Sequence, residues 1–577
     1  MRKHGVLIDD LFTAVTPNLA EMQNPNDVHF NGAGYEFLGQ RVAEAILEAL
    51  QQRFTSGQIY ATHHLRDQQV NPMKTLVRLS VLFTLVFSNA PHVLGDVRVA
   101  GIFADHMVLQ RDRPIQVWGW ADKGKEVTVE FAEQAAKAMA GDDGTWSVTL
   151  KPLLTSAAGK ELRVQSNNQA IAIRDVVVGE IWHASGQSNM AMTVGSMAGD
   201  LEIVKSDIAA ADLPVIRFCR INEAESLQPL DDLRNSATWI PCSPATVSGF
   251  SGVAFYFARQ LHTELGIPVG IIDSSRGGTP IEPFIPREAF ESHPTLRRQL
   301  ELGDRNDLDG IWKLPGGVRA RDANWLPSRL FNSRLAPLTR FAVRGAIWYQ
   351  GESNSGVGED PRDYEHKMRA LITGWRQALR SDKMPVYSVQ LPGSGAGAGW
   401  PYLREQQRLA ADLPYSGMVV TVDIDGAGIH PPNKIDVGQR LARWALAEDY
   451  GKQITFSGPM YDRQEVQGGR IIVHFKHADK GLVVAVKDGL AEPREDPDAE
   501  LAHFELGDKD GNWWPAEAKI DGGTVVVRND NVQEPVAVRY AYQVSPENCN
   551  LYNRDGLPAS PFCSEPGMLR YDPGLPR

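Results

Sequence analysis

Short, continuously apolar runs alternate with amphipathic stretches through the middle of the chain, between residues 173 and 452. The apolar runs are typical of buried parallel strands, and they cover residues 176–184, 269–273, 346–349, 386–389 and 419–424. Helical patterns lie between or after these runs, at residues 253–265, 364–379 and 437–449. The first helix is predicted to stop at Gly266, because glycine readily adopts the left-handed conformation of a helix end. This alternation predicts an α/β fold with a mostly parallel, doubly wound sheet.

The regions on both sides of this segment change to a period of two, which is typical of strands with one buried face. Residues 115–120 alternate in this way, as do residues 471–475 and 524–527 near the carboxyl end. Polar turns such as Asp143-Gly144 separate the runs. We therefore expect the α/β domain at residues 173–452 to be flanked by β-sandwich-like domains at residues 91–172 and 453–577.

The composition of the chain reduces the number of plausible partners and cofactors. The chain of 577 residues has a net charge of −12 and a pI near 5.7, which argues against nucleic acid as a partner. Cys219 lies near Cys242 in the sequence and Cys549 near Cys563, so two local disulfides and four buried thiols are equally compatible with the pattern. No Cys-x-x-Cys pair or His-Glu-x-x-His helix is present, so we expect no metal cofactor.

Residues 73–90 have the pattern of a secretory signal, although they lie inside the chain. Lys74 and Arg78 precede an apolar run at residues 79–87, and small residues end it at Ser88-Asn89-Ala90. The run is too short to span a bilayer, so we expect no membrane-spanning segment. We expect the functional protein to begin near Pro91 and to be secreted or periplasmic; the alternative is a buried strand or helix at residues 79–87.

Residues with catalytic chemistry follow four of the predicted strands. Gly186-Gln187-Ser188 ends the first strand, Gly277 and Gly278 follow the second, residues 350–354 follow the third, and His430 follows the last. Parallel strands align their carboxyl ends. We therefore expect these four segments to meet at one edge of the sheet.

These residue types suit nucleophilic attack on an ester. A serine hydroxyl attacks once a histidine takes its proton, which pairs Ser188 with His430 as nucleophile and base. The oxyanion that forms needs fixed hydrogen-bond donors. The candidate donors are the N–H groups of Ser188, Gly277 and Gly278 and the side-chain amides of Gln350 and Asn354. The alternatives are structural roles: a helix cap for Ser188, a turn for the glycines, a loop position for His430, and loop hydrogen bonds for the amides.

Seven segments resemble the sialate O-acetylesterase family of SGNH hydrolases, in that family's order and spacing, between residues 96 and 564. They are Met107-Val108-Leu109-Gln110, residues 185–190 (SGQSNM), Gly277-Gly278-Thr279, residues 348–354 (WYQGESN), Ile429-His430-Pro431, residues 550–553 (NLYN) and residues 556–562 (GLPASPF). The resemblance implies an SGNH-type esterase domain between two β-domains. It also implies removal of acetyl groups from sugar hydroxyls without a cofactor.

Two positions depart from that family's pattern. Gly428 stands where the family has an aspartate, two residues before the histidine, so the acid of a catalytic triad is open. Glu352 is the first candidate, because related acetylesterases use the glutamate of a Gln-Gly-Glu sequence in this way; Asp425 is the second, and a dyad without an acid is the third. Arg276 stands where a tryptophan is expected, and it suits either a contact with a sialate carboxylate or an ordinary loop salt bridge.

We therefore expect a serine esterase that removes O-acetyl groups from sugars, with O-acetylated sialic acid as the first candidate substrate. Acetylxylan or another acetylated plant polysaccharide is the alternative substrate. A non-catalytic glycan-binding protein is the alternative of a different class, because the β-domains and the 13 tryptophans would suit it.

Residues 1–72 resemble the end of a second SGNH hydrolase. Asp27 and His29 share one loop there, and an amphipathic helix is predicted after them at residues 36–51. The few residues before this loop hold no matching nucleophile. We therefore interpret the segment as a remnant without independent activity.

Overall fold

The computed structural model describes residues 97–571, apart from residue 168 and residues 314–324, 356–359, 394, 396 and 425–427. Contacts divide the chain into two units, and every described residue belongs to the second, residues 95–577. The remnant predicted at residues 1–72 and the signal-like segment predicted at residues 73–90 lie outside the described residues, as does Asp425. Within the described part of the chain, no helix has the length and apolar character needed to cross a membrane.

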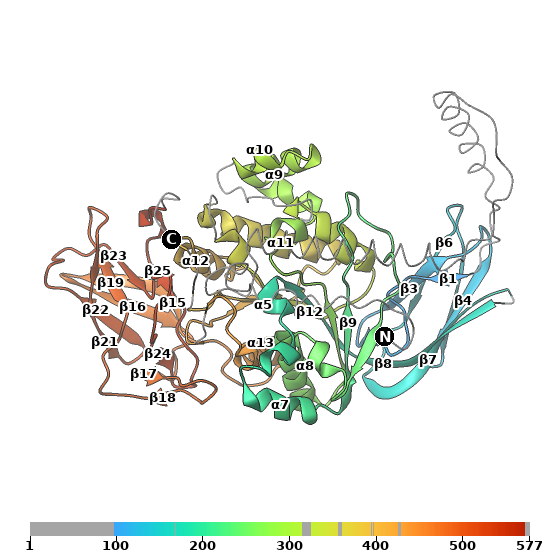
Figure 1. Ribbon diagram of the computed structural model, residues 1–577, viewed down its shortest axis with the longest axis horizontal. Coiled ribbons are helices and arrows are strands. Elements are labelled where there is room, and N and C mark those ends of the chain that lie inside the picture. Colours follow the sequence, from blue (N-terminus) through green and yellow to red (C-terminus); the bar gives the residue numbers. More distant parts are fainter. Residues whose placement is uncertain are drawn as a thin grey trace, which may run out of the picture. The chain divides into compact units, whose positions relative to one another are not determined.

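A sheet that includes β8, β9 and β12 lies at the centre of this unit (Figure 1). Its strand order is β10-β9-β11-β8-β12-β13-β14. From β9 to β14 in that order, neighbouring strands run parallel, and β10 (Trp239–Cys242) pairs antiparallel with β9 at the edge. The parallel strands are β8 (Gln169–Gly186), β9 (Leu213–Arg220), β11 (Val269–Asp273), β12 (Gly345–Tyr349), β13 (Val386–Val389) and β14 (Ser416–Val419). The prediction of a mostly parallel sheet is confirmed.

Successive residues of these strands enter two different hydrophobic cores, because neighbouring side chains in a strand point to opposite faces. Ile271 and Ile347 share one core with α8 and α13, whereas Ile272 and Trp348 share the other core with α11 and α12. The four helices are α8 (Gly252–Leu265), α11 (Tyr364–Ala378), α12 (Trp400–Ala410) and α13 (Lys434–Glu448). Helices therefore cover both faces of the sheet, which is the doubly wound arrangement.

Strand β8 connects the central sheet to the amino-terminal β-strands. Its first part pairs with β7 (Ser156–Ser166) and β2 (Val108–Gln110), and its last part pairs with β11 and β12. The predicted boundary between residues 172 and 173 therefore falls inside one continuous strand. The other strands here are β4 (Glu126–Phe131) and β5 (Gln134–Met139), and the separate sheet of β1 (Arg98–Val99), β3 (Ile115–Trp120) and β6 (Thr145–Leu150).

Antiparallel sheets follow α13, and their apolar side chains, such as Ile471, Leu506 and Val525, form a third core together with Met418, Val420 and Val422. One sheet has the order β15 (Met460–Gln467), β16 (Arg470–Lys476), β22 (Thr524–Arg528), β21 (Glu517–Asp521). The second has the order β18 (Arg494–Glu495), β17 (Leu482–Val486), β24 (Leu551–Asn553). The third has the order β20 (Trp513–Pro515), β19 (Phe504–Gly507), β23 (Ala537–Tyr540), β25 (Phe562–Cys563).

The structure corrects the end of one predicted strand and decides between the two alternatives for the cysteines. The strand predicted at residues 419–424 ends at Val419, because Arg440 binds the Val420 carbonyl at 2.8 Å and the Asp423 carboxylate at 2.7 Å and so holds the chain in a turn. All four cysteines are buried free thiols, so the disulfide alternative is wrong. The other α-helices with described bounds are α5 (Ser188–Ala191), α6 (Val194–Met197), α7 (Glu202–Ala209), α9 (Pro294–Asp304) and α10 (Leu308–Trp312).

Candidate active site

Ser188 is the first residue of α5, directly after the carboxyl end of β8. Gly186 permits the sharp turn between them, since its φ is 136° and an added Cβ would lie 2.0 Å from the carbonyl oxygen of Tyr349. Gln187, and not Ser188, occupies the helix N-cap position. The helix-cap alternative for Ser188 is therefore set aside, and the hydroxyl lies at the carboxyl edge of the sheet.

His430 approaches Ser188 from the loop between β14 and α13. The Nε2 atom of His430 lies 2.7 Å from the Ser188 Oγ, although 242 residues separate the two in sequence. Both residues are half-buried, so the pair is partly open to solvent. A hydrogen bond of this length is what proton transfer from the hydroxyl to the imidazole requires.

The glycine turn after β11 faces the same serine. An added Cβ on Gly277 would lie 3.8 Å from Ser188 Cβ and 3.9 Å from Ser188 Cα, with no nearer atom outside its immediate neighbours. The N–H of Ser188 has no acceptor inside its own helix, because it belongs to the first turn. Among the described residues, the N–H groups of Ser188, Gly277 and Gly278 donate to no protein acceptor. They are therefore available to a bound oxygen.

Buried polar groups fix the position of this glycine turn. Arg334 donates from Nη1 to the carbonyl oxygens of Ser274 at 3.0 Å and Ser275 at 2.9 Å. The N–H of Arg276 donates to the Gly186 carbonyl at 2.9 Å, which ties the turn to the end of β8. The backbone before Gly277 is thus held at both sides by hydrogen bonds, as a preorganised donor requires.

The side-chain amides of Gln350 and Asn354 point into the protein. Gln350 Nε2 donates to Gln187 Oε1 at 3.0 Å and to Asn354 Oδ1 at 2.7 Å, while Tyr364 donates to Gln350 Oε1 at 2.5 Å. Asn354 Nδ2 donates to Glu282 Oε2 at 3.1 Å. Because these donors are already engaged and both residues are fully buried, we leave the two amides out of the oxyanion site and interpret them as supports of the surrounding loops.

Glu352, the first candidate for the triad acid, makes its hydrogen bond to a different residue. Its Oε1 accepts from the side-chain amide of Asn189, while its Oε2 has no partner among the described residues. Burial raises the pKa of Glu352 to about 7, so the carboxyl is not held as a firm anion at neutral pH. Glu352 therefore contacts the residue that follows the serine. Asp425, the second candidate, is outside the described residues.

Arg276 lies beside Gly277 with its side chain half-buried. Among the described residues it forms no ion pair with a carboxylate, so the loop salt bridge that was the alternative for it is not present there. Its charge instead adds to the effect of burial in lowering the pKa of the neighbouring Arg334 to about 10. A guanidinium with no carboxylate partner among the described residues is suited to attracting an anionic group.

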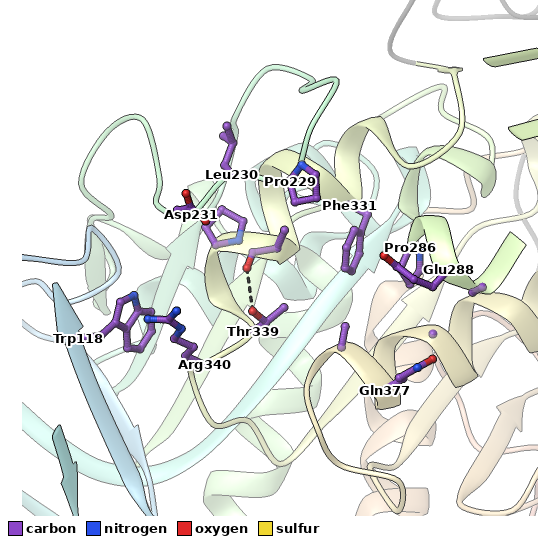
Figure 2. Close-up of a pocket in the computed structure, with 15 residues that line it drawn as sticks. Trp118, Pro229, Leu230, Asp231, Pro286, Glu288, Phe331, Thr339, Arg340 and Gln377 are labelled. Atoms are coloured by element: carbon purple, nitrogen blue, oxygen red, sulfur yellow. Dashed lines mark hydrogen bonds between the residues drawn. The ribbon is translucent and has the colours of Figure 1, made fainter. Parts of the chain in front are cut away.

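Two further observations concern metal binding and a cavity outside the site. Within the described part of the chain, no cluster of three or more His, Cys, Asp or Glu side chains is arranged to hold a metal ion. A cavity of about 370 Å³ lies elsewhere, between Trp118 of the amino-terminal strands, Phe331 and the end of α11 (Figure 2). Its described lining includes Asp231, Glu288 and Arg340 but neither Ser188 nor His430, so it is not the site of attack on an ester.

Comparison with known proteins relates this chain to one enzyme family. A family model described as carbohydrate esterase, sialic acid-specific acetylesterase, matches residues 316–447. The crystal structure of a carbohydrate acetylesterase from Xanthomonas citri is 33% identical with a TM-score of 0.70, and the match covers 81% of this chain and 99% of that one. Sialate O-acetylesterase of Rattus norvegicus is 27% identical over 81% of this chain and 94% of its own length. The Homo sapiens protein of the same name is 28% identical, over 82% and 94%.

The fold, the site and these relatives define a carboxylic ester hydrolase that acts on acetylated carbohydrates. The chain belongs to the sialate O-acetylesterase family of carbohydrate esterases. The resemblance that the sequence motifs indicated is confirmed.

Proposed function

We propose that the enzyme removes O-acetyl groups from sialic acid, with Ser188 as the nucleophile and His430 as the base. The observation that carries the catalytic assignment is the 2.7 Å contact between Ser188 Oγ and His430 Nε2 at the carboxyl edge of the sheet. Placement of both groups beside a glycine turn is the constellation that acyl transfer needs.

In the first half of the reaction, His430 Nε2 takes the Ser188 proton while Oγ attacks the acetyl carbonyl carbon. The carbonyl oxygen becomes an oxyanion, and the N–H groups of Ser188 and Gly277, with Gly278 beside them, donate to it. The bond to the sugar oxygen then breaks, and the protonated His430 gives its proton to that oxygen. The products are the free sugar hydroxyl and an acetyl ester on Ser188.

In the second half, a water molecule attacks the acetyl-serine carbonyl, and His430 accepts the water's proton. The same N–H groups stabilise the second oxyanion. Collapse of this intermediate releases acetate, and the proton on His430 returns to Ser188 Oγ. No cofactor takes part in either half.

Two acids are candidates for orienting His430. Glu352 contacts Asn189, and its raised pKa makes it a weak direct partner for an imidazolium. We therefore propose that Glu352 acts through Asn189, and we keep Asp425, five residues before His430, as the candidate for a direct contact. Substitution of each carboxyl by its amide separates the two roles.

The proposal that the sugar is sialic acid is supported by Arg276 together with the names of the relatives. Sialic acid differs from the sugars of xylan in carrying a carboxylate. Arg276 offers a fork-shaped donor without a described partner beside Gly277. A charge-assisted contact of this kind contributes about 1.5–3 kcal/mol, which corresponds to a factor of about 10 to 100 in kcat/KM.

The test measures acetate release from O-acetylated sialic acid, from its methyl ester, and from acetylxylan, with the wild type and Arg276→Ala. We expect the substitution to lower kcat/KM about 10- to 100-fold for the free acid only. An equal loss on all three substrates would show that Arg276 has a general structural role. A wild type that prefers acetylxylan would favour the alternative substrate.

We also propose that the enzyme is secreted or periplasmic, because residues 73–90 have the pattern of a secretory signal. The sequence of the amino terminus of the protein isolated from its own host tests this. A mature chain that starts near Pro91 is expected, and a chain that retains residues 73–90 would contradict the proposal.

A further inference from the structure

Asn189, which directly follows Ser188, contacts Ile429, which directly precedes His430. Asn189 Nδ2 donates to the carbonyl oxygen of Ile429 at 2.8 Å. Two contacts therefore join the loops. The side chains of Ser188 and His430 form the first, and Asn189 with the Ile429 carbonyl forms the second. Two adjacent hydrogen bonds fix the distance and the angle between the loops better than one bond can.

The amide of Asn189 is completely engaged. Its Nδ2 also donates to Glu352 Oε1, and its Oδ1 accepts from Lys434 Nζ at 2.5 Å. Both amide hydrogens and the amide oxygen are thus used inside the protein, and the residue is fully buried. The side chain of Asn189 cannot donate to an oxyanion in this arrangement, so the contribution of this side chain to catalysis must be indirect.

Lys434 is an unusual residue for this location. It is the first residue of α13, four positions after His430, and its side chain is fully buried. The ammonium lies 5.3 Å from the centre of the Tyr349 ring, and among the described residues no carboxylate pairs with it directly. Burial of an ammonium costs several kcal/mol, so the protein retains this lysine at a cost to stability.

A buried lysine that donates to an amide oxygen strengthens the donors of the same amide, because hydrogen bonds in a chain polarise one another. In its protonated form, Lys434 therefore strengthens the bonds from Asn189 to Ile429 and to Glu352. Burial raises the pKa of Glu352 to about 7 and lowers that of Lys434 to about 7, so both groups are only partly charged at neutral pH, and the hydrogen bonds of Asn189 carry the argument. Groups with such shifted pKa values cluster at functional sites.

We propose that Asn189 and Lys434 are positioning residues that hold the Ile429–His430 backbone against the loop of Ser188 and so set the contact between nucleophile and base. This inference rests on the catalytic roles proposed for Ser188 and His430. The two residues touch neither the substrate nor the reacting atoms. They act on kcat through the geometry of the pair, and a displacement of about 1 Å in such a pair costs about 100-fold in rate.

The test compares Lys434→Met with Lys487→Met. Lys487 is the matched control, because its side chain is only 5% exposed and its ammonium pairs with Asp436 in the first turn of the same helix at 2.9 Å, without contact to Asn189. The readouts are kcat and KM for p-nitrophenyl acetate, the rate at which a p-nitrophenyl phosphonate ester labels Ser188, and the melting temperature.

We expect Lys434→Met to lower kcat and the labelling rate about 10- to 100-fold with KM changed less than about twofold, whereas Lys487→Met changes only the melting temperature. Asn189→Asp is the second variant, in case Lys434→Met does not fold. It keeps the size of the side chain and its contact with Lys434 but replaces the donor that faces the Ile429 carbonyl by an acceptor. We expect a similar loss of kcat from it.

Folded variants with wild-type kcat and labelling rate would overturn the inference. The same holds if Lys487→Met loses as much kcat as Lys434→Met, because the effect would then be one of general stability. Failure of the proposed function looks different: the wild type itself would not be labelled at Ser188.

Discussion

Replacement of Gly277 by alanine tests the oxyanion site without disturbing the fold. The added methyl group would lie 3.8 Å from Ser188 Cβ and 3.9 Å from Ser188 Cα, which is ordinary van der Waals contact. The φ of Gly277 is outside the positive region, so alanine can adopt the backbone conformation. We therefore expect the free energy of unfolding to change by less than about 1 kcal/mol.

The effect on catalysis should be much larger. The methyl group fills the space beside the nucleophile, which the acetyl group of the substrate must enter to reach the N–H groups of Ser188 and Gly277. Displacement of the carbonyl oxygen from one oxyanion donor costs about 100- to 1,000-fold in kcat, and partial displacement costs less. We expect kcat/KM for p-nitrophenyl acetate to fall about 10- to 100-fold.

The assay measures kcat, KM and the melting temperature for Gly277→Ala beside Gly567→Ala. Gly567 is the matched control, because its φ is also outside the positive region and no atom lies within 4 Å of an added Cβ. It lies in the carboxyl-terminal region, away from the site. Wild-type kcat/KM in Gly277→Ala would refute the oxyanion assignment, and a fall in melting temperature of several degrees would show that the turn is more tightly packed than we infer.

Three other predictions follow from the sequence and the structure together. Glu352→Gln and Asp425→Asn decide which acid orients His430: the direct partner should cost several orders of magnitude in kcat, by analogy with loss of the correct tautomer, and the other far less; equal small losses would favour a Ser–His dyad. Burial lowers the pKa of His183 to about 3, so its folded form binds fewer protons than the unfolded form below the ordinary value of 6.5. Its contribution to stability is therefore present in full above about pH 6.5 and is lost as the pH falls toward about 3; in urea titrations, His183→Gln should lose less stability than the wild type over that range, and parallel losses would contradict the assignment. A chain that begins at Pro91 should fold and hydrolyse acetyl esters as well as the full chain, and a melting temperature lower by several degrees would show that the preceding residues complete a core.

The central sheet could be predicted from the sequence because its strands are buried on both faces and so consist of uninterrupted apolar residues. β11 and β13 have the predicted bounds for this reason. α12 gives no such signal. Its residues 404–408 are charged or amide side chains that are nonetheless buried, so the sequence does not indicate how deeply the polar face of this helix lies in the protein. The sequence of β8 also does not indicate that one strand continues from the amino-terminal sheet into the central sheet.

The contact between Ser188 and His430 could also be predicted, because parallel strands bring their carboxyl ends together. The directions of side chains could not. Gln350 and Asn354 are suitable oxyanion donors by type, but packing turns their amides toward Gln187 and Glu282. Asn189 and Lys434 were not among the candidates, since a lysine in the first turn of a helix is ordinarily exposed and no pattern in the sequence indicates its burial.

The central claim is that the Ser188 hydroxyl is the attacking nucleophile and that His430 is its base. The most direct measurement is kcat for acetate release by Ser188→Ala, His430→Ala and the double variant, each with its melting temperature. We predict that each single substitution lowers kcat by about 10⁴-fold or more with the fold retained, and that the double variant loses little more, because the two residues act as one unit. A folded Ser188→Ala enzyme with near-normal kcat, or losses that multiply in the double variant, would contradict the account.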